Sequence, residues 1–249
     1  GRSPVPHLHF QVQSTPYIGS KTIFYPISHF IHHEKGSFTL NSYEAPQKES
    51  LVSNISRNHS LEKAFHLIPG QKFSYQVKPA SGEEYRVDWE VQLDALNSTF
   101  VYCEKTNSRA YFYNDGEIHY FTHFDGDKSS LLFQYFLATY KVMMGYYRNL
   151  LVTDNYPVNT FSNQFMGIIQ DFVAPFYIFA HADFTIQYVG MEDELMQSGI
   201  KLHSVTSAKI GKHEIRKMEC DLFVGPHGHE RFTIQEKDQN TEVILRHER

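Results

Sequence analysis

The stretch EYRVDWEVQL, residues 84–93, alternates polar and apolar side chains along its whole length. Its apolar positions are Tyr85, Val87, Trp89, Val91 and Leu93. Because successive side chains of a β-strand point to opposite faces, this alternation gathers all five on one face. The stretch therefore predicts a half-buried strand of an antiparallel sheet.

Strand-like stretches of the same kind flank this one and return near the end of the chain. The dipeptide Asp115-Gly116 supplies the positive φ that a type I′ hairpin turn needs, so the neighbouring stretches predict a meander of four or five strands. A second meander is expected after residue 170. The candidate strands are 73–77, 98–105, 109–115, 117–124, 171–180, 184–195, 200–211, 213–225, 230–238 and 241–249.

Apolar residues recur at helical spacing only between the two meanders and just before the first. Residues 128–146 predict one long helix, with Leu131, Leu132, Tyr135, Phe136, Val142 and Met143 on its core face. A short helix is expected near residues 58–68, where Asn58 or Ser60 can cap it and Pro69-Gly70 ends it. The fold class is thus α+β and mostly β: a large curved antiparallel sheet of two meanders packed on one long helix.

Composition excludes several classes of protein. The net charge is −5 and no basic stripe is present, so nucleic acid is not an expected partner. The most apolar stretches are interrupted by polar residues or proline and fall short of the roughly 20 residues that a membrane span needs. Two cysteines, Cys103 and Cys220, cannot define a disulfide framework and leave open whether they pair.

The stretch PHLHFQV, residues 6–12, carries the most specific motif of the chain. His7 and His9 lie two residues apart, so a strand would point both imidazoles to one face, where they can share a metal. Residues 1–12, GRSPVPHLHFQV, resemble a signature of the lysostaphin-type zinc endopeptidases, which cut peptide cross-bridges in peptidoglycan. Gln11 replaces the usual Glu of that signature, and Val5 replaces the usual Gly before the proline.

The resemblance implies a role for each histidine. His9 would be a zinc ligand, and His7 would orient or deprotonate the metal-bound water. The family's other two ligands, from a His-x-x-x-Asp motif, would lie upstream of Gly1. Zinc is therefore expected in a longer parent protein, and tight binding of zinc by these 249 residues alone is not. Residues 15–31 are also reminiscent of bacterial envelope proteins that join a urea-transporter-like membrane domain to a lysostaphin-type domain.

These observations predict three regions. Residues 1–33 would be the terminal strand segment of a peptidase domain, 34–60 a polar linker or arm, and 61–249 an antiparallel β-rich accessory domain. Four weaker histidine groups are expected to be exposed or at hairpin tips, and not to bind metal. They are His29 with His32 and His33, His119 with His123, His181 with Asp183, and His227 with His229 and Glu230.

The favoured hypothesis is a non-catalytic accessory, ligand-binding or scaffold domain of a bacterial envelope protein that carries a peptidase-like region. A shape analogy with curved-sheet periplasmic proteins suggests a groove lined by Tyr111, Tyr113 and Phe121. Expected partners are a cell-wall peptide, a lipid or another envelope protein, in the periplasm or cell envelope. The alternative is a zinc metalloendopeptidase acting on peptidoglycan peptides, with its remaining ligands outside this chain.

Overall fold

The structure is a computed structural model that describes residues 11–157, 160–161, 180–211, 213–226, 228–237 and 239–246. The chain divides into two compact units, Gly1–Ile55 and Ser56–Arg249. All the strand pairs of both units are antiparallel among the described residues, and the mostly β fold class is confirmed.

The first unit consists of short strands. Strand β3 pairs with β4 and β5, and the two-residue strands β1 and β2 pair with each other. The β3–β4 turn places Lys35 and Gly36 at positive φ, as a tight hairpin turn requires. Residues 34–60, expected as a linker or arm, thus contain most of a hairpin. The strands are β1 Val12–Gln13, β2 Thr22–Ile23, β3 Ile27–Glu34, β4 Ser37–Glu44 and β5 Leu51–Ser53.

The second unit is built on one long run of strands in the order β11-β10-β9-β8-β7-β6-β17-β16-β15-β14-β13-β12. Both predicted meanders are present among the described residues, and β17 joins them by pairing with β6. The candidate strand 171–180 lies outside the described residues except for Ala180. The strands are β6 Lys72–Pro79, β7 Tyr85–Leu93, β8 Thr99–Cys103, β9 Ser108–Asn114, β10 Ile118–Asp125, β11 Lys141–Met143, β12 Leu151–Asn155, β13 Ala180–Asp193, β14 Ser198–Ile210, β15 His213–Gly225, β16 Gly228–Glu236 and β17 Gln239–Leu245.

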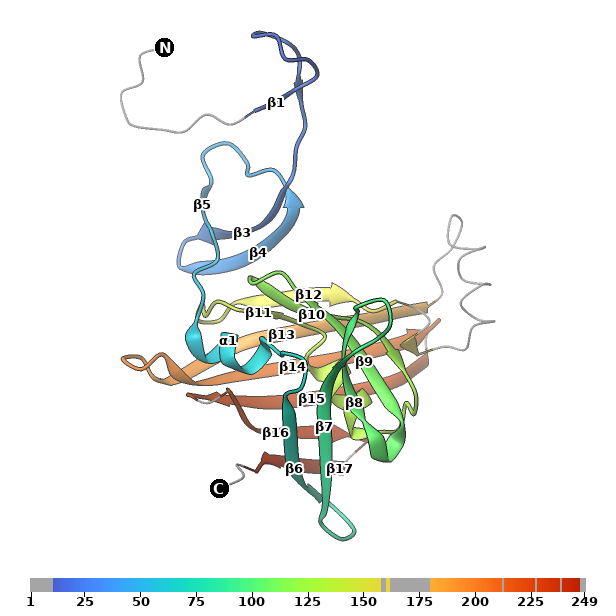
Figure 1. Ribbon diagram of the computed structural model, residues 1–249. Helices are drawn as coiled ribbons and strands as arrows, with labels where there is room; N and C mark the ends of the chain where they lie inside the picture. The colour runs from blue at the N-terminus through green and yellow to red at the C-terminus, as the bar shows by residue number, and fades with distance from the viewer. Residues whose placement is uncertain are drawn as a thin grey trace. The chain divides into compact units, whose positions relative to one another are not determined.

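This sheet is strongly curved: β13 to β16 run across the view in Figure 1, whereas β6 to β9 run steeply. Register shifts interrupt the pairs β9–β10, β13–β14, β14–β15 and β15–β16, and such bulges bend and twist a strand. The curvature brings the two ends of the strand order together. Lys141 of β11 donates to Asp154 of β12 over 2.8 Å. The Lys141 side chain is largely buried and the Asp154 side chain is half-buried.

Helix α2, Leu131–Ala138, lies against the concave side of the sheet and forms the centre of the core. Seven of its eight residues are buried. The Phe136 ring lies 5.3 Å from Phe121 and 5.6 Å from Phe124 of β10. On the other side of the helix, Tyr135 packs on Trp89 of β7 and on Phe232 of β16. The helix therefore joins the two meanders through ring contacts.

The long helix predicted over 128–146 is wrong in its second half. The Thr139 side chain bonds to the Tyr135 carbonyl, and the chain leaves helical geometry at this residue. Residues Lys141–Met143 instead form β11, which pairs with β10. Val142 and Met143 remain fully buried, because a strand on the sheet's edge buries them as well as a helix face would.

Helix α1, His59–Phe65, confirms the predicted N-cap. The Asn58 Oδ1 accepts from the backbone N–H groups of Ser60 and Leu61, at 3.0 and 3.1 Å. Neither of the two described α-helices, seven and eight residues long, is long enough to cross a membrane.

Replacing Asn58 with Ala should lower the free energy of unfolding by about 1–2 kcal/mol, because two amide groups of the first turn lose their acceptor. Urea unfolding followed by circular dichroism measures this change. The matched control is Asn58→Asp, which keeps the acceptor but loses the bond from Nδ2 to the Gln197 carbonyl. An equal loss in both variants would assign the effect to Gln197 and not to the cap.

Candidate functional site

The histidines of the peptidase-like motif, His7 and His9, lie outside the described residues, so zinc binding by them stays a prediction. Within the described ranges, no three His, Cys, Asp or Glu side chains come close enough together to hold a metal ion. In the first unit, the imidazole of His33 lies 2.8 Å from the Ser53 hydroxyl, and that of His29 lies 3.1 Å from the Ser28 hydroxyl.

Both cysteines are buried as free thiols, Cys103 in β8 and Cys220 in β15. Each belongs to the inward-facing row of its strand. Burial raises the pKa of the Cys220 thiol well above its ordinary value, and the nearby Asp221 carboxylate raises it further. A thiol held neutral in this way is a poor nucleophile, so Cys220 serves as a small core residue.

Two histidines that were expected at the surface lie in the core. His119 is fully buried among Phe65, Phe112 and Phe121, and neither of its ring nitrogens has a hydrogen-bond partner among the described residues. Burial lowers the pKa of His119 to about 3, and the neighbouring His229 lowers it too. The prediction of an exposed His119 is therefore wrong.

His229 was expected in a flexible hairpin tip, yet it packs on helix α1. Its ring lies 4.6 Å from Phe65, and its Nε2 lies 2.8 Å from the Tyr135 hydroxyl. Burial lowers the pKa of His229 to about 4. Gly228 has a φ of +104°, a backbone conformation that favours glycine at the start of β16. Strands β15 and β16 stay paired up to Gly225 and Gly228. His227, the other histidine of this expected group, lies outside the described residues.

His119 and His123 do not share a face, because β10 carries a bulge between Phe121 and His123. The extra residue returns Phe124 to the core side, where it meets Phe133, and turns His123 outward. The expected groove of Tyr111, Tyr113 and Phe121 does not form, because Phe121 pairs with Phe112 and the two tyrosines alternate to the other face of β9. Phe121 is buried against α2, whereas both tyrosines belong to the opposite face.

The convex side of β8, β9 and β10 carries a set of rings that we call the outer aromatic face. Tyr111 stacks on His123 at 4.0 Å and packs on Phe100 at 5.0 Å. Tyr113, 53% exposed, lies 5.4 Å from Tyr120. Cross-strand register places these rings opposite one another. The members of the face are Phe100, Tyr102, Tyr111, Tyr113, Tyr120 and His123.

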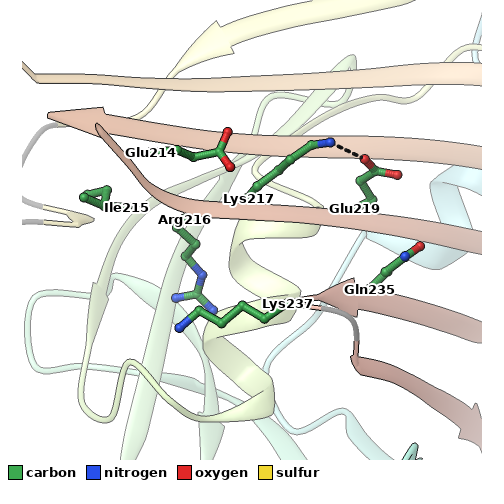
Figure 2. A pocket seen from close by; sticks show the side chains of 7 residues that line it. All are labelled: Glu214, Ile215, Arg216, Lys217, Glu219, Gln235 and Lys237. Carbon is green, nitrogen blue, oxygen red and sulfur yellow. Dashed lines mark ion pairs between the residues drawn. The ribbon is translucent and has the colours of Figure 1, made fainter. Parts of the chain in front are cut away.

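A charged region lies where β15 begins and β16 ends, near the start of α2. Figure 2 shows Arg216 and Lys237 side by side there, with the Lys217–Glu219 ion pair beyond them. On the core side, Arg216 Nη2 donates to Glu236 Oε2 over 2.8 Å, and Gln134 of α2 donates to the same oxygen over 3.2 Å. Sequence reasoning missed this cluster, because its members are up to 102 residues apart and no local pattern marks them.

Comparisons with known proteins identify no family. No protein-family model matches the chain, and no curated protein matches it. A solved structure similar to it comes from Bacteroides fragilis and is described as that of a protein proposed to be exported, with a YMCC-like fold. The two share 12% identity with a TM-score of 0.29, over 72% of this chain and 95% of the other. A similarity with so low an identity and TM-score supports no conclusion about the present chain.

Proposed function

We propose that the second unit is a non-catalytic accessory module of a bacterial envelope protein, and that it binds its ligand on the outer aromatic face. The supporting observation is that Tyr111, Tyr113 and His123 reach solvent on the side of the sheet that faces away from α2. Contiguous exposed rings are unusual for a surface without a partner. His119, His229 and both cysteines, by contrast, are buried in the core.

The rings are held in place before any ligand arrives. All of these rings except Tyr102 pack against a ring on the neighbouring strand, and Tyr102 packs on Phe100 of its own strand. The Arg109 guanidinium lies 5.3 Å above the Tyr102 ring while bonding to Asp125. Tyrosine has few rotatable bonds, so fixing it on binding costs little conformational entropy, and its hydroxyl still offers a hydrogen bond. A preorganised surface of this kind suits an extended ligand that lies across three strands.

The ligand that we favour is cell-wall material containing peptides. The support is the resemblance of residues 6–12 to a lysostaphin-type signature, since a module joined to such a domain would hold it near its substrate. This assignment places the module outside the cytoplasm. A lipid surface and another envelope protein are the competing ligands, and the experiment below separates the lipid surface from the cell wall.

Sedimentation with purified insoluble peptidoglycan tests the proposal. The wild-type chain should co-sediment, and Tyr111→Ala/Tyr113→Ala should lower the affinity about tenfold, since each lost aromatic contact is worth roughly 0.5–1.5 kcal/mol. Tyr17→Ala/Tyr43→Ala removes two exposed tyrosines of the first unit and serves as the control. Binding of the wild type to lipid vesicles and not to peptidoglycan, or equal losses in both double variants, would contradict the proposal.

The second candidate function, a zinc endopeptidase completed by residues outside this chain, is supported by the PHLHFQV motif. It predicts stoichiometric zinc in a longer form of the protein that includes the upstream region. Elemental analysis of that form and of its His9→Ala variant provides the measurement. Equal zinc content in the two forms would remove His9 from the ligand set.

A further inference from the structure

Helix α1 covers two buried imidazoles in the core of the second unit. The Phe65 ring lies 5.5 Å from the ring of His119 in β10 and 4.6 Å from the ring of His229 in β16. These two strands belong to different meanders, so one side chain of α1 contacts both. The buried side of the helix consists of Ser60, Leu61, Ala64 and Phe65.

The helix is held by its docking and by few bonds at its ends. The backbone N–H of Asn58 donates to the Met144 carbonyl over 2.7 Å, and Asn114 Nδ2 donates to the Phe65 carbonyl over 3.1 Å. Helix α1 has seven residues, and isolated helices shorter than about 12–15 residues are marginal in water. Its residues belong to no strand of the sheet, so it can leave without breaking a strand pair.

The strands and α2 surround the two imidazoles with uncharged groups. β9 and β10 contribute Phe112 and Phe121, which contact His119. α2 contributes the Tyr135 hydroxyl, 2.8 Å from His229 Nε2, and burial raises the pKa of this hydroxyl so that it stays neutral. Tyr135 and the other imidazole are thus the titratable groups that face either ring among the described residues.

Helix α1 adds two backbone carbonyls and no side-chain charge to these surroundings. The carbonyls of Phe65 and Ala64 face His119 and His229 and raise the pKa of each ring, but burial lowers both pKa values more. A proton on either ring is therefore favoured only after water reaches it. The ionisable side chains of α1 and its C-cap lie on the half-exposed or exposed side: His59, Glu62, Lys63 and His66.

We propose that α1 is an acid-released latch: proton uptake by His119 and His229 undocks the helix while the strands beneath it stay paired. Undocking lets water reach both rings and uncovers the apolar surface under Leu61 and Phe65. Local opening of this kind costs less free energy than unfolding of the whole unit, so it comes first as the pH falls. The latch lies on the core side of β10 and does not depend on the function proposed for the outer aromatic face.

The direction of the effect follows from the two pKa values, which are about 3 and about 4 in the docked state. Docking is fully favoured above the ordinary pKa of about 6.5 and weakens as the pH falls below it. From pH 7.5 to pH 5.5 each imidazole should raise the equilibrium constant for opening about tenfold. The two together should raise it about 100-fold.

Hydrogen–deuterium exchange of the full chain, followed by mass spectrometry at pH 7.5 and 5.5, tests the latch. After correction for the intrinsic pH dependence of exchange, the peptide covering residues 56–68 should show the rise of about 100-fold. Peptides from β14 and β15 should be more protected than α1 at both pH values. Equal protection of α1 and these strands would overturn the proposal, because α1 would then open only with the whole unit. An opening constant that does not change with pH would overturn it too.

Two single variants assign the effect to the buried rings. His119→Leu keeps a similar side-chain volume and should reduce the rise from about 100-fold to about tenfold, since one titrating imidazole remains. His59→Gln removes an exposed imidazole of α1 itself and should leave the rise at about 100-fold. A rise of about 100-fold in His119→Leu, or the same reduction in both variants, would contradict the latch.

Discussion

Lowering the pH from 6.5 to 4.5 is expected to reduce the free energy of unfolding of the second unit by about 4 kcal/mol, through His119 and His229 alone. Both imidazoles have pKa values depressed in the folded state, to about 3 and about 4. The unfolded chain therefore binds more protons throughout this pH window. Stability is fully present above the unfolded pKa of about 6.5 and is lost as the pH falls toward the folded values.

The physical cause is the surroundings of the two rings. Phe65 of α1 packs between them, and His119 contacts Phe112 and Phe121 on its other sides. Two titratable groups act on these imidazoles. Tyr135 bonds to His229, and His229 in turn lowers the pKa of His119. No carboxylate among the described residues contributes to either pKa shift. An imidazole that takes up a proton there would therefore have no counterion.

His119→Leu isolates this effect. It keeps a similar side-chain volume and removes two unpartnered ring nitrogens, so we expect about 1–3 kcal/mol of added stability at pH 7 and roughly half of the acid sensitivity. Guanidinium unfolding at several pH values measures both quantities. His123→Leu, on the exposed side of the same strand, is the control. A His119→Leu protein with an unchanged pH profile would show that carboxylates cause the acid loss.

Replacing Phe136 with Ala should lower the free energy of unfolding by about 3–5 kcal/mol, the second large effect. The side chain is 1% exposed and its ring lies within 6 Å of four others, Phe121, Phe124, Phe133 and Tyr140. Removing it leaves a cavity between α2 and the sheet, which the surrounding rings can fill only in part. Thermal and chemical unfolding, followed by near-ultraviolet circular dichroism, provide the measurement.

Leu195→Ala is the control for this change, because Leu195 is 97% exposed and should alter stability by less than about 0.5 kcal/mol. Phe136→Leu should fall between the two, since it removes less volume. A cost below about 1 kcal/mol for Phe136→Ala would mean that α2 does not organise the core and that the strands carry the stability without it.

Several elements of the fold follow from local pattern alone. In β7 every second residue from Val87 to Val91 is buried, as the alternation predicts. Asn58 caps α1, and Gly116 takes positive φ in the β9–β10 hairpin, although Asp115 does not, so the turn is not type I′. These features depend on residues only a few positions apart, so the local sequence specifies them.

Burial depends on contacts that the local pattern does not contain. Strand β9 has rings on both faces, so the sequence leaves open whether Tyr111 or Phe112 is buried, and the position of α2 decides it. Likewise, the bulge in β10 separates His119 from His123, and the docking of α1 covers His229. Sequence predicted exposure for all three histidines, because polar side chains are usually outside.

The sequence by itself determined most strands of the two meanders, the first helix and the α+β class, since period-two alternation and turn residues act locally. Only the tertiary structure decided that residues 141–143 leave the helix for a sheet edge, and that Arg216 meets Glu236 under Lys237. Pairing with β10 satisfies the backbone of Lys141–Met143 as well as a helix would. For these residues the local sequence accepts either a helix or a strand, and pairing with a distant strand selects the strand. The candidate sites likewise form only when distant strands and helices come together.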